Sequence, residues 1–352
     1  MNPLILPDQP LRYRALIGTG GVGTGMFFAI KGNRTLGREE SREGRFLDQR
    51  DYCKLHIIAH YVKVLLGPVF PAILISKVGQ DDTGHRLLKE MAGTGLDICH
   101  VAIDPDKQTM NAVCFLYPDG SGGNLTVNDS ACANVDEHSI HAVADDFARY
   151  AHQGIALAAP EVPLNARREL LSLATEHGFF RAASFSSGEI PQSLHMGLFA
   201  MLDLVAINMD EATALLGRAD PDEDYSSIAA DAVACLMAIN PALRVSVTGG
   251  RQGSWTWDGH HLQHAPALAV KTVSSAGAGD AHFAALLAGL AANLTLPQAQ
   301  ELATLTAACS VTSPHTIHPT LDRTLLAVLA VESGIPLSDP VRHLLGIERK
   351  GI

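Results

Sequence analysis

The sequence predicts an α/β fold with a mainly parallel central sheet and helices on both of its faces. Apolar runs rich in β-branched residues alternate with longer stretches of helical periodicity along most of the 352 residues, which is typical of parallel strands joined by crossover helices. The composition, with 47% hydrophobic and 18% charged residues, is that of a folded globular chain. The length allows one large domain with its own core.

The regular elements alternate in the order that a parallel sheet requires. Strands are expected at Ala15–Gly18, Ala72–Gly79, Gly154–Pro160, Leu202–Asn208 and Arg244–Gly250. Helices are expected at Asp51–Gly67, Thr83–Gly95, Ala166–Gly178, Met209–Gly217, Ser226–Asn240 and from Gly279 onward. Since helices would then cover both faces, the strands between them should be buried on both sides.

Two segments interrupt this order. Residues Thr109–Asn128 hold two strand-like runs around a Pro-Asp-Gly turn, which predicts a β-hairpin. Residues 31–50 are charged and contain Gly32, Gly37 and Gly44. We expect residues 31–50 and 109–128 to form a small lid, and residues 1–30, 51–108 and 129–352 to form the main domain.

The bulk properties argue against several classes of function. A net charge of −11 gives no general basic surface for nucleic acid. The longest apolar stretch, Val62–Val78, is broken by Pro68 and Pro71 and is a poor membrane span. The chain opens without the zones of a signal peptide, and its six cysteines form no C-x-x-C pair, so we expect a cytoplasmic protein. No histidine spacing indicates a transition-metal site.

A glycine-rich stretch follows the first expected strand. Gly18-Thr-Gly20-Gly21-Val-Gly23 matches the G-x-G-x-x-G pattern of dinucleotide-binding proteins, which makes an NAD-dependent oxidoreductase one alternative. The crossover helix that this motif needs is missing, because only a short apolar run separates the glycines from Gly32. We therefore favour a turn at a strand end that requires positive φ values.

A second small-residue turn lies near the end of the chain. Gly277-Ala278-Gly279-Asp280 comes directly before an apolar helical pattern. The unpaired N–H groups and the helix dipole at such a helix start favour an anion, and the glycines allow a phosphate to approach the backbone. Asp280 could act in catalysis, or it could simply stabilise the first turn of the helix.

Two further loops follow expected strands. Asn208 and Glu211 could hold the water shell of Mg²⁺ near nucleotide phosphates, or they could form an ordinary helix cap. Thr248, Gly250 and Gly253 could contact phosphates, or they could form a hairpin turn. Because sites in parallel sheets gather at the carboxyl ends of strands, these loops and the turn before Asp280 should converge on one crevice.

In the order of these parts the chain resembles the ribokinase-like carbohydrate kinases, also called the phosphofructokinase-B family. GQDDTG at 79–84 resembles its G-x-D-x-x-G segment, NMDE at 208–211 its N-x-x-E motif, TGGRQG at 248–253 its T-x-G-x-x-G loop, and GAGD at 277–280 its C-terminal signature. The resemblance spans roughly residues 73–320. It implies a three-layer sandwich with a mainly parallel sheet, a small β-lid, and ATP-dependent phosphorylation of a sugar or sugar-like hydroxyl.

The resemblance also implies roles for individual residues. Asp280 would be the catalytic base, and the N–H groups of Gly277, Ala278 and Gly279 would form the anion hole. Asn208 and Glu211 would position Mg²⁺ through water, with Glu211 as the metal-linked carboxylate. The residues expected to line ATP are Thr248, Gly250, Gly253 and, in the segment Ala307–Pro319 beside the adenine, Ser310.

The substrate side departs from the family pattern. The G-G-x-x-x-N motif expected before Gly67 is replaced by a stretch that begins at Asp51 and includes Lys54, and the glycine-rich stretch stands where the family has an aspartate. The arginines of 31–50 are balanced by acidic residues, so they form either a solvated surface or a clamp for an acidic sugar. The candidate substrate contacts are Gly20, Gly21, Asn33, Asp51 and Lys54.

The expected partner is a small sugar-like molecule, with neither nucleic acid nor a membrane involved. Lid strands of this family often pair between subunits, so the resemblance also implies a homodimer. The NAD-dependent oxidoreductase remains one alternative. The other is a catalytically silent ligand-binding protein on the kinase fold, because the sugar motif is missing.

Overall fold

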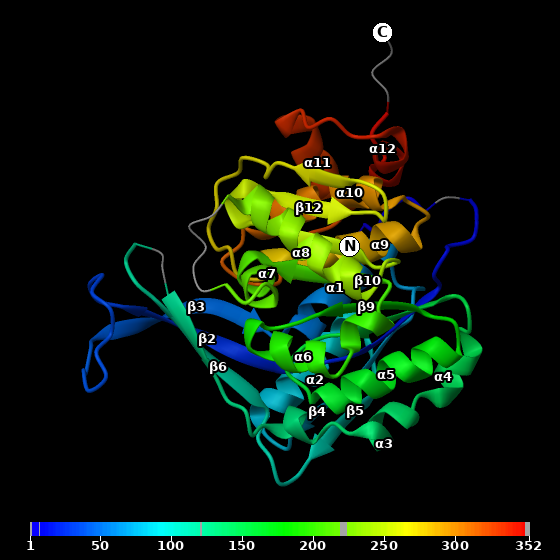
Figure 1. Cartoon of the computed structure of the whole chain (residues 1–352). Helices are drawn as coiled ribbons and strands as arrows, with labels where there is room; N and C mark the ends of the chain where they lie inside the picture. Colours follow the sequence, from blue (N-terminus) through cyan, green and yellow to red (C-terminus); the bar gives the residue numbers. More distant parts are fainter. Residues whose placement is uncertain (1, 7, 120–121, 219–223, 349–352) are drawn as a thin grey trace.

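A computed structural model of the chain describes residues 2–6, 8–119, 122–218 and 224–348 and contains two sheets (Figure 1). The larger sheet has nine strands. Their spatial order is β13 (Leu262–Ala265), β12 (Ser254–Trp257), β11 (Arg244–Thr248), β10 (Leu204–Asn208), β9 (Phe180–Ser184), β8 (Gly154–Ala158), β1 (Ala15–Thr19), β4 (Ala72–Gly79) and β5 (Asp97–Asp104). All neighbours from β5 to β11 are parallel, and β12 is antiparallel to both of its neighbours, β11 and β13. The predicted mainly parallel sheet is confirmed.

Helices cover both faces of this sheet, as predicted. One face carries α1 (Lys54–Leu66), α2 (Asp82–Thr94), α9 (Ala278–Ala291), α10 (Leu296–Ser310), α11 (Arg323–Ser333) and α12 (Asp339–Leu345). The other carries α3 (Glu137–His141), α4 (Ala144–Arg149), α5 (Leu164–Glu176), α6 (Ile190–His195), α7 (Met209–Leu215) and α8 (Tyr225–Ile239). Short 3₁₀ turns lie at Ala131–Asn134, Ser187–Glu189, Leu198–Met201 and Gly250–Gln252. Two separate hydrophobic clusters result, one on each side of the sheet.

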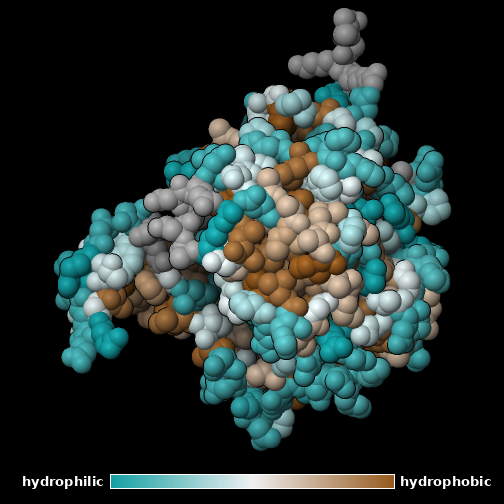
Figure 2. All heavy atoms as spheres, viewed as in Figure 1, coloured by the Kyte–Doolittle hydropathy of each residue, from teal (hydrophilic) through white to brown (hydrophobic). Residues whose placement is uncertain are grey.

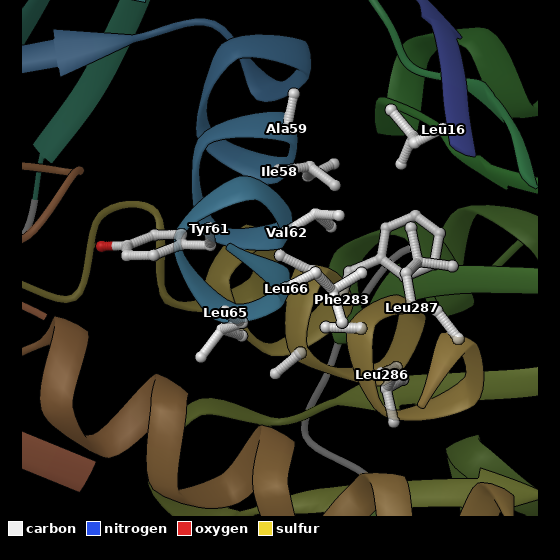
Figure 3. Packing of buried hydrophobic residues seen from close by; sticks show 14 of the residues in the cluster. Leu16, Ile58, Ala59, Tyr61, Val62, Leu65, Leu66, Phe283, Leu286 and Leu287 are labelled. Carbon is white, nitrogen blue, oxygen red and sulfur yellow. The ribbon is translucent and has the colours of Figure 1, made fainter. Parts of the chain in front are cut away.

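Helices α1 and α9 pack against each other at the centre of one layer. Ile58, Val62 and Leu66 of α1 point toward Phe283 and Leu287 of α9, and all of these residues are buried (Figure 3). Burial of each such side chain stabilises the fold by about 1.5–3 kcal/mol. The packing fixes the two helices relative to each other, and it therefore fixes the positions of their first residues.

The smaller sheet has the order β3 (Gly44–Tyr52), β2 (Gly23–Ile30), β6 (Met110–Leu116) and β7 (Gly122–Thr126), and it projects from the main body (Figure 1). The predicted hairpin is confirmed, because β6 and β7 pair antiparallel. Gly120 of its turn lies outside the described residues. The division at residue 30 was wrong: β2 pairs with β3 and β6, so its alternating side chains belong to the small sheet and not to the main domain.

The glycine-rich stretch serves close packing and not a turn with positive φ. None of the glycines from Gly18 to Gly25 has a positive φ. A Cβ atom on Gly20 would lie 2.7 Å from the Cβ of Ala159 and 2.8 Å from the Cβ of Leu55. A Cβ on Gly23 would lie 2.6 Å from the carbonyl oxygen of Met110. The sequence is glycine-rich here because β1, α1, β8 and the small sheet meet without room for side chains.

Every helix in the described ranges is too short or too polar to serve as a membrane span.

Candidate active site

A cavity of about 1010 Å³ opens at the carboxyl ends of the central strands. It is lined by the ends of β10 and β11, the first residues of α1 and α9, and part of α10. The predicted residues that line it are Lys54, Asn208, Glu211, Thr248, Gly250, Gly253, Gly277, Ala278, Gly279 and Asp280. The structure therefore brings the three predicted loops into one crevice, as the strand-end argument requires.

The turn before α9 has the shape of an anion site. Gly277 has a φ of 78° and caps the helix, and a Cβ there would lie 2.7 Å from the carbonyl oxygen of Thr316. The N–H of Ala278 donates to the carbonyl of Ser275 at 3.3 Å. Within the described ranges no acceptor meets the N–H groups of Gly279 and Asp280. Those two N–H groups and the helix dipole are thus available to an anion.

Asp280 combines a position in the crevice with an altered acidity. Burial raises its pKa to about 7. The positive charge of Lys54 lowers that pKa, and the negative charges of Glu161, Glu211 and Asp51 raise it. A carboxyl group with a pKa near neutral pH can take and release a proton under physiological conditions.

Glu211 is held by two different interactions. It forms a capping box with Asn208 at the start of α7, in which Asn208 N–H donates to Oε2 at 2.9 Å and Glu211 N–H donates to Asn208 Oδ1 at 2.8 Å. Its Oε1 also accepts a hydrogen bond from Lys54 Nζ at 3.0 Å. Asn208 and Glu211 therefore form the helix cap that was one alternative, and the same two residues also line the crevice.

The loop after β11 forms a hairpin turn and also lines the cavity. β11 and β12 pair antiparallel, so residues 249–253 are a hairpin turn, and Gly250 and Gly253 have φ values of 54° and 94°. The same glycines line the cavity. Thr248 lies beside the anion turn, because a Cβ on Gly279 would be 3.6 Å from its hydroxyl oxygen.

Ser310 and His282, near the crevice, both have buried side chains. Ser310 is 2% exposed, and its hydroxyl donates to the carbonyl of Ala307 at 2.8 Å. Its neighbours Ala307, Ala308 and Val311 line the cavity instead. His282 is also buried, and its Nε2 lies 3.1 Å from the hydroxyl of Ser254.

The candidate substrate contacts are only partly brought together. Gly20 and Gly21 are buried under neighbouring elements. Asp51, at the end of β3, lies on the crevice side of the small sheet, and burial raises the pKa of its carboxyl. Asn33 is exposed in the loop between β2 and β3 and accepts from Asp119 N–H at 3.1 Å, so it lies apart from the cavity lining.

Sequence reasoning missed Glu161, which follows β8. Its φ of 75° is rare for a residue with a side chain, and its Oε2 is buried without a partner among the described residues. Burial raises the pKa of its carboxyl, and its charge acts on Lys54, Asp280 and Cys53. The available signal was an acidic residue directly after a buried parallel strand.

The glycine-rich stretch does not form a dinucleotide site. A Cβ on Gly21 would lie 2.5 Å from the Cβ of Glu161, so a carboxylate side chain fills the space above this glycine. No helix follows it either, since β2 begins at Gly23. The described ranges also contain no group of three His, Cys, Asp or Glu side chains placed to bind one metal ion.

The chain is similar in sequence to known kinases. The family description "pfkB family carbohydrate kinase" matches residues 58–323. Fructoselysine 6-kinase of Shigella flexneri is 28% identical over 241 residues, which cover 67% of this chain and 81% of that protein. The bifunctional protein HldE of Caulobacter vibrioides is 27% identical over 242 residues, which cover 66% of this chain but only 47% of that protein.

Solved structures show the same fold. Ribokinase of Giardia lamblia superposes with a TM-score of 0.75 at 16% identity, covering 88% of this chain and 98% of that one. Ribokinase of Arabidopsis thaliana, complexed with ribose and ATP, gives 0.70 at 19% identity, covering 90% and 98%. The nucleoside kinase of Burkholderia thailandensis, in complex with inosine, gives 0.69 at 16% identity, covering 91% and 98%.

Proposed function

This chain belongs to the pfkB family of carbohydrate kinases, and from that premise we propose that it transfers the γ-phosphoryl group of ATP to a hydroxyl of a sugar or sugar-like small molecule. The observation that carries the proposal is Asp280, which stands at the start of α9 with a pKa raised to about 7, next to unpaired N–H groups. A base and an anion site thus lie within one turn of chain.

In the proposed reaction the acceptor oxygen forms a bond to the γ-phosphorus while the bond from phosphorus to the β,γ-bridging oxygen breaks, and ADP leaves. The acceptor proton passes to the carboxylate of Asp280. The N–H groups of the anion turn stabilise the negative charge on the transferred phosphoryl oxygens. We assign the anion hole to the N–H groups of Gly279 and Asp280, beside Gly277. The N–H of Ala278, which the sequence also indicated, donates to the carbonyl of Ser275 and would contribute only through the shape of the turn.

For the nucleotide we propose the walls formed by Thr248, Gly250 and Gly253, with Ala307 and Ala308 of α10 near the adenine. Complexes of two ribokinases, one with ATP and one with ADP, support this assignment, because they share the fold. Ser310 would act there only through the shape of α10, since its hydroxyl is bonded within the helix.

Magnesium fits this crevice only through water. Three N–H contacts already reach the Glu211 carboxylate, two on Oε1 and one on Oε2, which leaves room for a water on its remaining lone pairs. Glu211 and Asn208 would therefore meet the hydration shell of an ion carried by the nucleotide. The ion itself would neutralise charge on the β- and γ-phosphates.

For the acceptor we propose the space between the small sheet and the main domain. Asp51 and Glu161 would accept hydrogen bonds from substrate hydroxyls, and the small sheet would act as a lid that excludes water. Gly20 and Gly21 would shape the floor from beneath, and Asn33 would contribute only through the loop at the outer end of the lid. The name of the Shigella flexneri relative supports an acceptor of the sugar class.

We propose a cytoplasmic homodimer joined through the small sheets. All six cysteines are free, which suits a reducing compartment. The face of the small sheet that points away from Asp51 carries apolar side chains in register across its strands, among them Met26, Phe46 and Leu125 with exposed fractions of 43%, 64% and 66%. Figure 2 shows hydrophobic surface on this projecting part.

The test compares the wild type with Asp280→Asn. With MgATP and a panel of sugars, sugar derivatives and nucleosides, we expect the wild type to phosphorylate at least one acceptor and the variant to lose about 10³-fold or more in kcat. The Kd for ATP, measured by calorimetry, should stay within about threefold because no nucleotide contact is removed. An active variant would refute the assignment of the base, and thermal stabilisation by NADH but not by ATP would refute the nucleotide.

A further inference from the structure

We propose that Lys54 is a further catalytic residue, whose ammonium contacts the phosphoryl group in transfer and holds Asp280 in its ionised form. This inference rests on the proposed kinase reaction. It assigns to Lys54 a contact with the transferred group, in place of the contact with the acceptor that the sequence indicated.

The position of Lys54 is unfavourable for the helix that carries it. Lys54 is the first residue of α1, and the first turn contains no acidic residue. A cation near the positive end of the helix dipole costs a few tenths to about 1 kcal/mol. The side chain nevertheless turns into the crevice, where it is only 27% exposed. Helix stability therefore does not explain this lysine.

The ammonium is held from two other elements. Its Nζ donates to the carbonyl of Phe185 after β9 at 2.8 Å and to Oε1 of Glu211 on α7 at 3.0 Å. An ammonium has three N–H groups, and no described residue accepts the third. Burial disfavours the charged form, but the charges of Glu211 and Asp280 outweigh it, and the pKa of Lys54 is raised. Lys54 is thus a fixed positive charge with one free donor.

Three sources of positive potential meet in this part of the crevice. The N-terminus of α9 presents its N–H groups, the N-terminus of α1 adds a second helix dipole, and Lys54 adds a full charge. Around them stand the carboxyl groups of Asp280, Glu161 and Glu211. A phosphoryl group is the anion that matches this field, because its oxygens can bind the N–H groups and the ammonium together.

The same charge controls the base. Burial raises the pKa of Asp280, and the positive charge of Lys54 is the strongest of the effects that lower it. Without it, the pKa of Asp280 should rise above about 7, and less of the enzyme would carry the ionised base at neutral pH. A purely structural ion pair with Glu211 would affect stability but would move neither the pH dependence nor the phosphoryl step.

The experiment compares Lys54→Met and Lys54→Arg with the wild type, using Lys63→Met as the matched control. Lys63 lies on the same helix and also donates to backbone carbonyls, those of Pro68 and Phe70, but it lies outside the cavity. The measurements are kcat at saturating MgATP and acceptor, the pH profile of kcat/KM, and the titration of the Asp280 carboxyl by ¹³C NMR in the ligand-free protein. Asp280→Asn identifies its signal.

For Lys54→Met we expect kcat to fall about 10²-fold, as for the loss of one oxyanion donor. Both the acidic limb of the pH profile and the Asp280 titration should move to higher pH. Lys54→Arg should recover part of kcat and keep the Asp280 titration near that of the wild type, since it restores the charge. Lys63→Met should change thermal stability alone.

An Asp280 titration that does not move in Lys54→Met, or a kcat within twofold of the wild type, overturns the proposal. If Lys54→Met does not fold, Lys54→Gln takes its place, because it also removes the charge. An Asp280 titration that moves to higher pH together with a lowered kcat in Lys54→Gln then supports the proposal, and an unmoved titration or a kcat within twofold of the wild type overturns it. Failure of the kinase proposal is distinguishable, because the wild type would then phosphorylate no acceptor while the NMR titration still reports the coupling of Lys54 to Asp280.

Discussion

At the scale of single residues, the acidity of Asp280 leads to a prediction about pH. The group acts as a base only when it is ionised, and burial raises its pKa to about 7. We therefore expect kcat/KM to increase with pH through about 7, with about a tenfold gain between pH 6 and pH 8. A steady-state profile of the wild type checks this. A profile that is flat over this range would mean that Asp280 is not the group that titrates.

The close packing of the glycine-rich stretch gives a second prediction. Gly20→Ala places a methyl group 2.7 Å from the Cβ of Ala159, and neither that atom nor the Cβ of Leu55 can move without moving the backbone. We expect it to lower the free energy of unfolding by about 1–3 kcal/mol. Gly93→Ala is the control, because it lies in α2 with open space around it and should be neutral or stabilising.

Urea unfolding of both variants measures the difference. Equal stability of Gly20→Ala and the wild type would show that the glycines are not required for packing. In that case the close contacts between β1, α1 and β8 could relax at little cost.

The sequence predicted some of these residues well and others badly, for physical reasons. The place of Asp280 in the crevice was predictable because it depends on local order, a small-residue turn at a helix start. Glu161 and the pairing of Lys54 with Glu211 depend on residues that are far apart in the chain, so no local pattern reveals them. Asn33 lies apart from the cavity lining because the length of strands β2 and β3, which carries it outward, cannot be read from composition.

At the scale of elements, the loop after α10 connects the lid to the anion turn. Thr316 N–H donates to the carbonyl of Arg50 in β3 at 3.0 Å, and its hydroxyl accepts from Tyr52 N–H at 3.2 Å. Its carbonyl lies against Gly277. One residue therefore touches both the end of strand β3 and the first residue of the turn before α9.

We predict that Thr316→Val loosens this end of β3. Valine keeps the shape but leaves Tyr52 N–H without its acceptor, at a cost of about 1 kcal/mol. The KM for the acceptor should rise about fivefold and the Tyr52 amide should exchange faster, while the KM for ATP changes little. Thr316→Ser should behave like the wild type. An unchanged amide exchange rate in Thr316→Val would contradict this role.

The elements that the sequence predicted are the long apolar ones. Strands β4 and β8 and helices α1 and α5 are buried on patterns that local periodicity reveals. Strand β5, in contrast, is mostly exposed along its length and lies at the edge of the sheet, so it lacks the apolar run that marks a buried strand. Residues 23–30 were assigned to the main domain because their glycines resemble a turn, whereas they form strand β2 of the small sheet.

At the scale of the whole molecule, the two sheets contribute different residues around the crevice. The nine-stranded sheet and its two helix layers form the main body, which holds Asp280, Lys54 and Glu211 through packed helices. The four-stranded sheet contributes Asp51 from strand β3, and its two faces differ in polarity. One face looks toward the crevice, and the other carries the apolar side chains described above. An exposed apolar face of this kind is typical of a surface that contacts another protein.

The last prediction concerns that apolar face. We expect the wild type to sediment as a dimer at about 10 µM, because burying Phe46 and Leu125 against a second copy removes apolar area from water. Phe46→Asp combined with Leu125→Asp should yield monomers, since each new carboxylate would be buried without a partner. Val69→Asp, at a site 87% exposed in the loop after α1, should remain dimeric. A monomeric wild type, or a dimer that survives the double substitution, would show that the two copies do not meet through the lid.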